Sequence, residues 1–347
     1  MTGPPRQAPP PTVSIVLPVR NGAGTLEAAI ASLRAQTLPD WELLVVDDGS
    51  TDATPALLAR WTQTDSRLRI LSPPKGGLVD ALNTGLAAAR GRFIARMDAD
   101  DLAHPERLSA QVDLLEAHPE LGLAGTQVAF GGDASTAAGY ALHVEWLNTL
   151  LDPEAIALNR FVESPLAHPS VMFRADLPAR HGAYREGPFP EDYELWLRWL
   201  EAGVRMAKVP RVLLTWNDPR GRLSRTDPRY DPEAFYRCKA GFLARWIARH
   251  VPDSRPRLVW GAGRVTRRRA DLLAAAGVRL DGYLDIDPRK VGGSPGGRVV
   301  HEPAALRGPL RDAFVLGYVA KRGAREVARA HLRDCGFVEG RDFLMAA

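Results

Sequence analysis

Two carboxylates separated by one residue, Asp98 and Asp100, follow the predicted strand at 93–97. Carboxylate oxygens beyond the end of a strand suit a hard divalent cation, because Mg²⁺ and Mn²⁺ bind one or two carboxylates together with substrate phosphates. A cation held there would neutralise a departing diphosphate. The alternative is a solvated acidic turn, in which Asp101 or His104 only caps the helix that follows.

A third carboxylate, Asp48, follows another apolar run, at 41–46. At the end of a strand, its oxygens can accept a hydrogen bond from a nucleobase N–H or a ribose hydroxyl. The alternative is an Asx turn that Asp48 forms with Gly49.

Glu191 and Asp192 precede a segment in which Tyr193, Trp196 and Leu200 share one helical face. A carboxylate at this place could be a general base that removes a proton from an attacking hydroxyl. The alternative is a role in starting the helix, since the helix dipole favours acidic residues in the first turn.

Strands and helices in alternation must position these carboxylates. Segments rich in apolar residues at 13–18, 41–46, 67–71 and 93–97 predict strands, and the segments between them carry apolar residues at helical spacing. This alternation is typical of a parallel sheet covered by helices on both faces. The acidic residues then fall at the carboxyl ends of strands, where open α/β sheets bind their ligands. The part at 126–250 is less regular, and 216–230 is expected to be a long loop.

A second, smaller α/β unit is expected after the boundary at 252–256. Its first strand leads into Gly261-Ala262-Gly263, which begins like a dinucleotide fingerprint, and Asp285 lies about 20 residues further on. Thr266 stands where the fingerprint has its third glycine. We therefore expect this unit to bind a nucleotide weakly or not at all, and to serve packing or dimerisation instead.

Composition argues against several classes of protein. The 347 residues contain 45 Lys and Arg against 41 Asp and Glu, and a net charge of +4 is too small to indicate a polybasic face for nucleic acid. Cys238 and Cys335 have no metal-ligand spacing, which argues against a zinc site and a disulfide framework. No apolar run approaches the ~20 residues of a membrane span, and the N-terminus lacks the apolar core of a signal peptide. Residues 1–11 are expected to form a disordered Pro-rich tail.

Together these features resemble the family 2 glycosyltransferases of the GT-A fold. The matching motifs, in chain order, are VSIVLPVRN at 13–21, QTLPDWELLVVDDGSTD at 36–52, ARMDADD at 95–101 and EDYELWLR at 191–198. The resemblance covers residues 12–225 and implies an α/β domain at 12–250, with a Rossmann-like mixed sheet flanked by helices. Within this domain, residues 12–125 would bind the nucleotide sugar and residues 126–250 would bind the acceptor. The unit at 253–347 resembles small Rossmann-like domains appended to bacterial sugar-modifying enzymes.

By this resemblance the protein is a metal-dependent inverting glycosyltransferase. It would move a sugar from a nucleotide-sugar donor, with a UDP-sugar expected, to a hydroxyl acceptor in cell-surface polysaccharide or glycoconjugate synthesis. Asp98 and Asp100 would hold Mg²⁺ or Mn²⁺, and Asp192 would be the base, oriented by Glu191. Donor contacts are expected from Pro18, Arg20, Asp48, Asp98 and Arg225. Many relatives carry Tyr where this chain has Arg20, which can stack on a base or reach phosphate and leaves the donor base open.

The acceptor, a glycan or a lipid-linked sugar, is expected to contact His168 and Trp196. Their alternatives are a buried, hydrogen-bonded histidine and a core tryptophan. Arg222 and Arg225 could close over the diphosphate, and the alternative there is a solvated basic loop. The expected location is the cytoplasm, and a lipid-linked acceptor would add peripheral contact with the inner membrane face.

Two other functions remain open from the sequence. A nucleotidyltransferase that makes nucleotide sugars would need a phosphate loop rich in Gly and Lys or Arg after the first strand, where only Arg20, Gly22 and Gly24 stand. A non-enzymatic nucleotide-sensing or nucleic-acid-binding module is suggested by the arginine content, but the acidic clusters would repel a polyanion.

Overall fold

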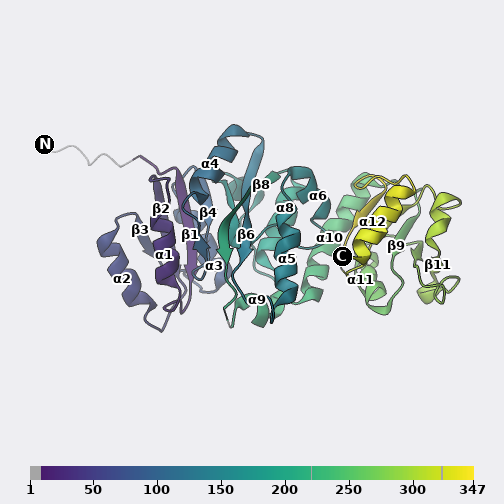
Figure 1. Cartoon of the computed structure of the whole chain (residues 1–347), viewed down its shortest axis with the longest axis horizontal. Coiled ribbons are helices and arrows are strands. Elements are labelled where there is room, and N and C mark those ends of the chain that lie inside the picture. Colours follow the sequence, from purple (N-terminus) through teal and green to yellow (C-terminus); the bar gives the residue numbers. More distant parts are fainter. Residues whose placement is uncertain (1–8, 220, 322) are drawn as a thin grey trace. The chain divides into compact units, whose positions relative to one another are not determined.

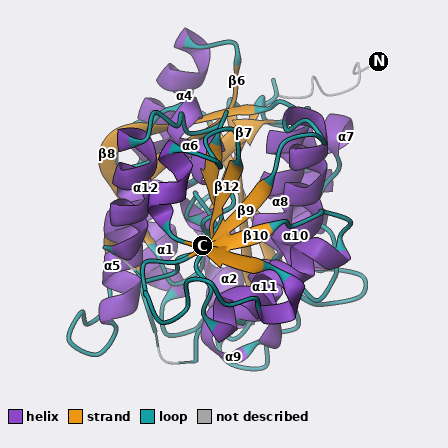
Figure 2. Ribbon diagram, turned by 90° about the vertical axis from the view of Figure 1, so that its right-hand side faces the viewer, coloured by secondary structure: helices purple, strands orange, loops and turns teal. Residues whose placement is uncertain are grey.

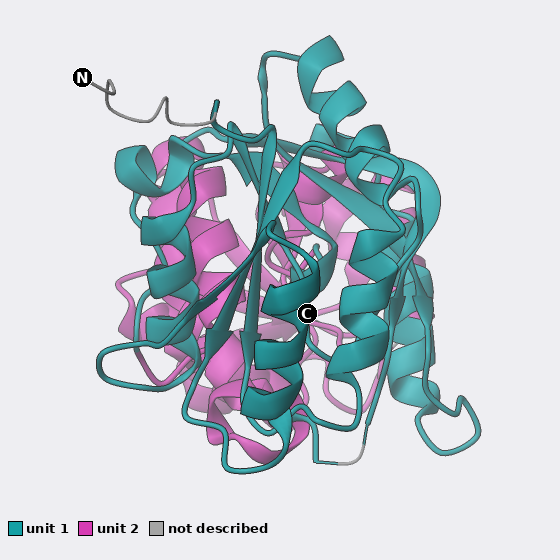
Figure 3. Ribbon diagram, turned by 90° about the vertical axis from the view of Figure 1, so that its left-hand side faces the viewer, with its two compact units in different colours: residues 1–153, 166–186, 202–222 teal, residues 154–165, 187–201, 223–347 magenta. Residues whose placement is uncertain are grey.

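The computed structural model describes residues 9–219, 221–321 and 323–347, so most of the expected Pro-rich tail, residues 1–8, lies outside the described part. The chain divides into two compact units (Figure 3). The first takes in the chain up to residue 153 together with 166–186 and 202–222, and the second takes in 154–165, 187–201 and 223–347.

The first unit is built on an eight-stranded mixed sheet with the order β3-β2-β1-β4-β7-β6-β8-β5 (Figure 1). Its strands are β1 (Val13–Val19), β2 (Trp41–Asp47), β3 (Leu68–Leu71), β4 (Phe93–Arg96), β5 (Leu102–Ala103), β6 (Leu121–Phe130), β7 (Met172–Arg174) and β8 (Arg205–Trp216). The strands β3, β2, β1 and β4 run parallel, while β7 is antiparallel to both β4 and β6. The four strands expected from the apolar runs are confirmed, and the antiparallel β7 makes the sheet mixed.

Helices cover this sheet because their apolar faces complete its core. They are α1 (Leu26–Arg34), α2 (Thr54–Thr64), α3 (Leu78–Ala88), α4 (Arg107–Ala117), α5 (Ala138–Asn148) and α7 (Leu177–His181). All residues of β1 are buried, as expected for a central strand with helices on both faces. Its apolar side chains share one hydrophobic cluster with those of α1, β2 and α4.

A five-stranded, entirely parallel sheet with the order β11-β10-β9-β12-β13 lies in the second unit. Its strands are β9 (Arg257–Trp260), β10 (Gly282–Leu284), β11 (Val299–His301), β12 (Phe314–Gly317) and β13 (Phe343–Met345). Figure 2 shows β12, β9 and β10 side by side. The helices of this unit are α6 (Pro153–Asn159), α8 (Glu191–Glu201), α9 (Leu223–Thr226), α10 (Pro232–His250), α11 (Arg264–Ala275) and α12 (Ala324–Asp334).

The hydrophobic core of the second unit joins segments from both sides of residue 250. Leu197 of α8 and Leu243 of α10 belong to the same cluster as Val259 of β9, Leu273 of α11 and Phe314 of β12. The apolar faces of α8 and α10 are therefore buried in one core with the C-terminal sheet.

The expectation of a long loop at 216–230 is wrong in part. The short helix α9 and a 3₁₀ turn at Pro228–Tyr230 occupy much of this segment. Asp227 accounts for the turn, because its side chain accepts a hydrogen bond from the backbone N–H of Arg229. No helix among the described residues is long and apolar enough to cross a membrane.

Candidate functional site

The carboxyl ends of β2, β1 and β4 bring several predicted residues to one edge of the first sheet. These strands are parallel neighbours, so their ends lie side by side. Arg20 directly follows β1, and Asp48 directly follows β2. Arg20 Nη1 lies 3.9 Å from Asp48 Oδ2. Pro18 is a buried residue of β1 itself and is aligned with Val46 of β2.

Asp98, Asp100 and Asp101 form an acidic cluster just beyond β4. Each offers one carboxylate oxygen, and the three oxygens lie within 4.8 Å of one another. Buried Arg96, the last residue of β4, forms an ion pair with Asp98. The sequence predicts Asp98 and Asp100 as metal ligands, and the tertiary structure adds Asp101 as a third carboxylate.

Burial and mutual repulsion disfavour negative charge in this acidic cluster. Removal from water and the neighbouring Asp98 carboxylate raise the pKa of Asp100 to about 6, against the opposing effect of Arg222 and Arg96. Burial and the charges of Asp98 and Asp100 raise the pKa of Asp101 well above its usual range. Asp101 Oδ2 is buried and accepts no hydrogen bond from any described residue. Three close carboxylates with one unused buried oxygen fit a hard divalent cation, whose charge would offset their repulsion.

Asn217, the residue after β8, binds two members of the acidic cluster. Its backbone N–H donates to Asp101 Oδ1 at 2.8 Å, and its Nδ2 donates to the carbonyl oxygen of Asp100 at 2.6 Å. The antiparallel pairing of β5 with β8 places it there, because Leu102 is aligned with Thr215. Sequence reasoning missed Asn217, and neither its type nor its spacing carries a signal.

Arg222 lies beside this asparagine. Its Nη1 donates to the carbonyl oxygen of Asn217 at 3.3 Å, and its Cζ lies 4.5 Å from the centre of the Trp216 ring. A guanidinium stacked on an aromatic face still donates hydrogen bonds from its edge, as Arg222 does to Asn217. The segment after β8 therefore brings a cation toward the acidic cluster.

Asp48 holds the glycine turn that starts α3. Its Oδ1 accepts a hydrogen bond of 2.7 Å from the backbone N–H of Gly77. Gly76 and Gly77 have φ values of 80° and 94°, a region that favours glycine. It is Asp47 that bonds to its own turn, by accepting from the N–H of Ser50 at 3.0 Å. The alternative of an Asx turn at Asp48 is thus wrong.

His168 is buried in the first unit and bonded to a tyrosine. Its Nε2 lies 2.8 Å from the Tyr184 hydroxyl oxygen. Burial and the charge of Arg96 lower the pKa of His168 well below its usual range, so the ring is neutral at pH 7. Asn83 fixes Tyr184 in turn, because its side chain donates to the tyrosine carbonyl and accepts from its N–H. This is the arrangement of the alternative, a buried and hydrogen-bonded histidine.

Glu191 and Asp192 begin α8 in the second unit. Glu191 is 2% exposed, and its Oε2 accepts a hydrogen bond of 2.6 Å from the Tyr230 hydroxyl. Asp192 is half-buried, and its Oδ1 accepts from the N–H of Tyr193 at 2.7 Å. Burial and the charges of Glu191 and Asp192 raise the pKa of Tyr230, which keeps its proton and its bond to Glu191. Sequence reasoning missed Tyr230, which lies 39 residues from its partner.

Trp196 and Arg225 also belong to the second unit. Trp196 is fully buried, and its ring meets that of Trp199 edge-on, with 5.8 Å between the ring centres. A ring without an exposed face cannot stack on a sugar, so the expected acceptor contact at Trp196 is wrong. Arg225 is exposed on α9.

The glycine turn after β9 is closed by the chain's own groups. Asp285 Oδ2 accepts hydrogen bonds from the N–H of Ala262 at 2.8 Å and from Lys290 Nζ at 3.0 Å. Its Oδ1 accepts from the N–H of Asp287 at 2.9 Å. These bonds use the carboxylate and the loop N–H through which a dinucleotide fingerprint would hold ribose and diphosphate.

Sequence comparisons match most of the region that carries the first sheet. The family model described as glycosyl transferase family 2 matches residues 14–175. The amylovoran biosynthesis glycosyltransferase AmsE of Erwinia amylovora is 33% identical over 191 residues, which are 54% of this chain and 69% of AmsE. The O-antigen biosynthesis glycosyltransferase WbnJ of Escherichia coli is 26% identical over 244 residues, which are 69% of this chain and 90% of WbnJ.

Solved structures share the fold at low sequence identity. The crystal structure of S. aureus TarS 1–349 in complex with UDP-GlcNAc gives a TM-score of 0.52 at 17% identity, over 76% of this chain and 71% of that chain. The mannosyltransferase PcManGT from Pyrobaculum calidifontis, in complex with GDP-Man and Mn²⁺, gives 0.50 at 20% identity, over 79% of this chain and 76% of that chain. These likenesses show a GT-A-type mixed α/β fold. The match to the family model and the 33% identity to AmsE establish that this chain is a glycosyltransferase and belongs to glycosyl transferase family 2.

Proposed function

We propose that this glycosyltransferase is a metal-dependent, inverting enzyme that uses a nucleotide-sugar donor, with a UDP-sugar as the expected donor. The acceptor is a hydroxyl group of a glycan or of a lipid-linked sugar. The observation that carries the proposal is the acidic cluster of Asp98, Asp100 and Asp101 at the end of β4, with its close carboxylates and unused buried oxygen.

The names of similar proteins support the cellular role. AmsE is named for amylovoran biosynthesis, and WbnJ for O-antigen biosynthesis. TarS binds UDP-GlcNAc in its crystal structure, and PcManGT binds GDP-Man and Mn²⁺. We accordingly propose a role in cell-surface polysaccharide or glycoconjugate synthesis. The reaction would take place in the cytoplasm, with peripheral contact to the inner membrane face when the acceptor is lipid-linked.

Asp98 and Asp100 are the residues that would hold Mg²⁺ or Mn²⁺. When bound, such a cation neutralises the charge that grows on the leaving diphosphate. The chain's own residues prepare this place, because Arg96 pairs with Asp98 and Asn217 orients Asp101. We further propose Arg225 as a ligand of the diphosphate, since guanidinium groups bind phosphate oxygens through two parallel hydrogen bonds.

Asp48, Arg20 and Pro18 are the proposed contacts of the donor base and ribose. Asp48 Oδ1 is engaged by Gly77, so Oδ2 is the oxygen that would accept from a base N–H. Arg20 is exposed beside that oxygen and offers a planar guanidinium to a base or a phosphate. Pro18 stiffens the strand end that carries Arg20, because its ring fixes φ.

Asp192 is the proposed general base. It takes the proton of the acceptor hydroxyl while the hydroxyl oxygen attacks the anomeric carbon opposite the diphosphate, and the bond from that carbon to the diphosphate oxygen breaks. One displacement of this kind inverts the configuration and passes through an oxocarbenium-like transition state. Glu191, held by Tyr230, orients the first turn of α8 that carries Asp192.

The proposed division of labour follows the chain. Residues 12–250 would carry the transfer, with donor binding by 12–125 and acceptor binding by 126–250. Residues 253–347 would serve packing or dimerisation. The hydrogen bonds of Asp285 support the assignment of residues 253–347 to packing or dimerisation, because both carboxylate oxygens that could hold a ribose are engaged by neighbouring groups of the chain.

The direct test is release of nucleotide from a panel of nucleotide sugars, measured with Mn²⁺, with Mg²⁺ and with a chelator. We expect turnover of one donor that the chelator abolishes and either metal restores. Asp100→Asn should lower it at least ~100-fold, since a catalytic cation contributes several kcal/mol of transition-state stabilisation. The matched control is Asp113→Asn, an exposed aspartate on α4. Full metal-dependent activity in Asp100→Asn would remove the metal assignment.

A further inference from the structure

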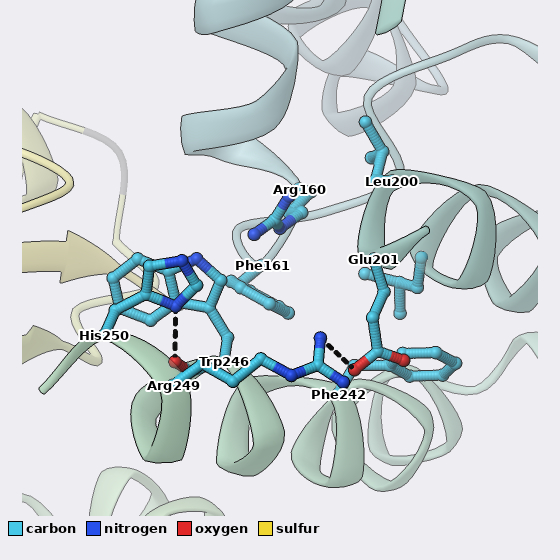
Figure 4. A pocket seen from close by; sticks show the side chains of 9 residues that line it. Arg160, Phe161, Leu200, Glu201, Phe242, Trp246, Arg249 and His250 are labelled. Carbon is cyan, nitrogen blue, oxygen red and sulfur yellow. Dashed lines mark hydrogen bonds and ion pairs between the residues drawn. The ribbon is translucent and has the colours of Figure 1, made fainter. Parts of the chain in front are cut away.

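The second unit contains a pocket of about 200 Å³ between the end of α6, the last turns of α8 and the C-terminal half of α10 (Figure 4). We call it the α8–α10 pocket and define it by Arg160, Phe161, Leu197, Glu201, Trp246 and Arg249. It is smaller than the ~300–1,000 Å³ sites of drug-sized ligands. A single sugar ring suits this volume, and a nucleoside diphosphate is too large for it.

Positive charge predominates around the α8–α10 pocket. Its one carboxylate, Glu201, is already bonded by Arg245 at 2.8 and 2.9 Å and pairs with Arg249 at 3.3 Å. Arg245 alone neutralises this carboxylate. Arg249 and Arg160 then leave a surplus of positive charge facing the cavity, which favours an anionic occupant.

Arg160 differs from Arg249 in the α8–α10 pocket, because no described residue forms a hydrogen bond or a close ion pair with its guanidinium. Figure 4 shows its side chain on the side of the pocket opposite Arg249. Its Cζ lies 5.0 Å from the centre of the Phe161 ring, and no described residue accepts a hydrogen bond from its guanidinium. Burial lowers the pKa of Arg160 to about 10, against the opposing charge of Glu201. A half-buried guanidinium with unused donors is a strong binding group for a carboxylate.

The remaining wall of the α8–α10 pocket is apolar. Phe161, Leu197 and Trp246 contribute to it. One face of the Trp246 ring is covered by His250, which stacks on it with 4.4 Å between the ring centres. Apolar walls favour a ligand that has a face of C–H groups beside its charge. A phosphate ion lacks such a face, and a neutral sugar lacks the charge.

The pocket is remote from the proposed base. Glu201 is the last residue of α8 and Asp192 its second, and at 1.5 Å per residue they are separated by about 14 Å along the helix axis. A ligand in the pocket therefore contributes binding, and takes no part in the bond changes at Asp192.

We propose that the α8–α10 pocket binds an acidic sugar residue of the acceptor glycan, at a distance from the hydroxyl that reacts. This inference rests on the proposed function and adds the class of acceptor to it. The carboxylate of a uronic acid would meet Arg160 and Arg249, and the C–H face of its ring would lie on the apolar wall.

The test compares two probes that differ only at one carbon, methyl β-D-glucuronide and methyl β-D-glucoside. Their binding to the full chain is measured by saturation-transfer NMR. We expect the glucuronide to bind at least tenfold more tightly than the glucoside. Arg160→Met should remove this preference, and Arg249→Met should reduce it. Arg237→Met, at an exposed arginine on α10 outside the pocket, should keep it.

Several outcomes would overturn the inference. Equal binding of the two glycosides would do so, as would an unchanged preference in both Arg160→Met and Arg249→Met. Displacement of the glucuronide by equimolar inorganic phosphate would also contradict it. So would tighter binding of farnesyl phosphate than of the glucuronide. Metal-dependent donor hydrolysis is measured in parallel and should be unchanged in Arg160→Met. Intact donor hydrolysis without glucuronide binding would remove only this inference, whereas absence of donor hydrolysis in every variant would remove the proposed function.

Discussion

Glu191 and Asp192 are adjacent carboxylates in different surroundings. Glu191 is almost fully buried and accepts a hydrogen bond from the Tyr230 hydroxyl, while Asp192 is half-buried in the first turn of α8. Burial and the tyrosine bond suit Glu191 to an orienting role, because its carboxylate is already engaged. Accessibility makes Asp192 the one of the pair that can meet a hydroxyl from solution.

Asp192→Asn is expected to lower transfer by about 10²–10⁴-fold, the usual contribution of a general base. The amide keeps the size and the acceptor oxygen that bonds to Tyr193, so the helix start should remain. Donor binding, measured by calorimetry with metal, should change little. The control is Asp334→Asn, at an exposed residue of α12. A large loss of donor affinity in Asp192→Asn would show that the base is placed wrongly.

Helix α3 packs closely on the middle of β1, the strand that leads to Arg20. Gly85 of α3 lies against Val16 of β1, so closely that a Cβ at this glycine would overlap the valine side chain. A glycine in the middle of a helix lowers its intrinsic stability, and here the loss is offset by the approach of helix to sheet. The close packing of α3 on β1 therefore depends on the absence of a side chain at Gly85.

Gly85→Ala is expected to lower the free energy of unfolding by about 1–3 kcal/mol, the usual cost of an added methyl group in a packed core. Gly241→Ala is the matched control, because this glycine also lies inside a helix, α10, and its Cβ would meet only Arg245 Nη1 at an ordinary 3.6 Å. It should raise stability by up to about 1 kcal/mol. Urea unfolding measures both, and equal effects would contradict the packing argument.

Each unit of the molecule contains a carboxylate held ionised by arginines. Two hydrogen bonds from Arg67, at 2.9 and 2.7 Å, lower the pKa of Asp65 in the first unit to about 2. In the second unit, against the raising effect of burial, bonds from Arg341 and Arg255 lower the pKa of Asp342 to about 2. A carboxylate with a lowered pKa stabilises the folded state above the pKa it has when unfolded, near 3.9.

This stabilisation should be present at pH 7 and disappear as the pH falls from about 4 to about 2. Asp65→Asn should therefore lower the free energy of unfolding at pH 7 by roughly 1–2 kcal/mol, and its difference from the wild type should shrink toward pH 2. Asp113→Asn, at an exposed residue, should differ little from the wild type at either pH. Urea midpoints at pH 7, 4 and 2.5 give the comparison, and a difference that persists at pH 2.5 would contradict the linkage.

Local patterns in the sequence were sufficient for the elements and for the types of residue in the candidate site. Segments rich in apolar residues predict β1, β2 and β4, and the acidic turns after β2 and β4 place Asp48, Asp98 and Asp100 at strand ends. The acidic start of α8 is equally local, since Glu191 and Asp192 are followed directly by apolar residues at helical spacing. Such signals are readable because strand, turn and helix preferences act over a few neighbouring residues.

The partners of these residues came only from the tertiary structure. Asn217 reaches Asp101 across 116 residues, and Tyr230 reaches Glu191 across 39. The sequence left open whether Trp196 is a core residue or an acceptor contact, and it did not predict a core that joins α8 and α10 to the C-terminal sheet. Contacts of this range depend on strand order and on which helix faces meet. The sequence by itself thus determined which groups can do chemistry and at which strand or helix ends they stand. The fold decided which of them are buried, bonded or turned toward a cavity, because those properties arise only when distant segments pack together.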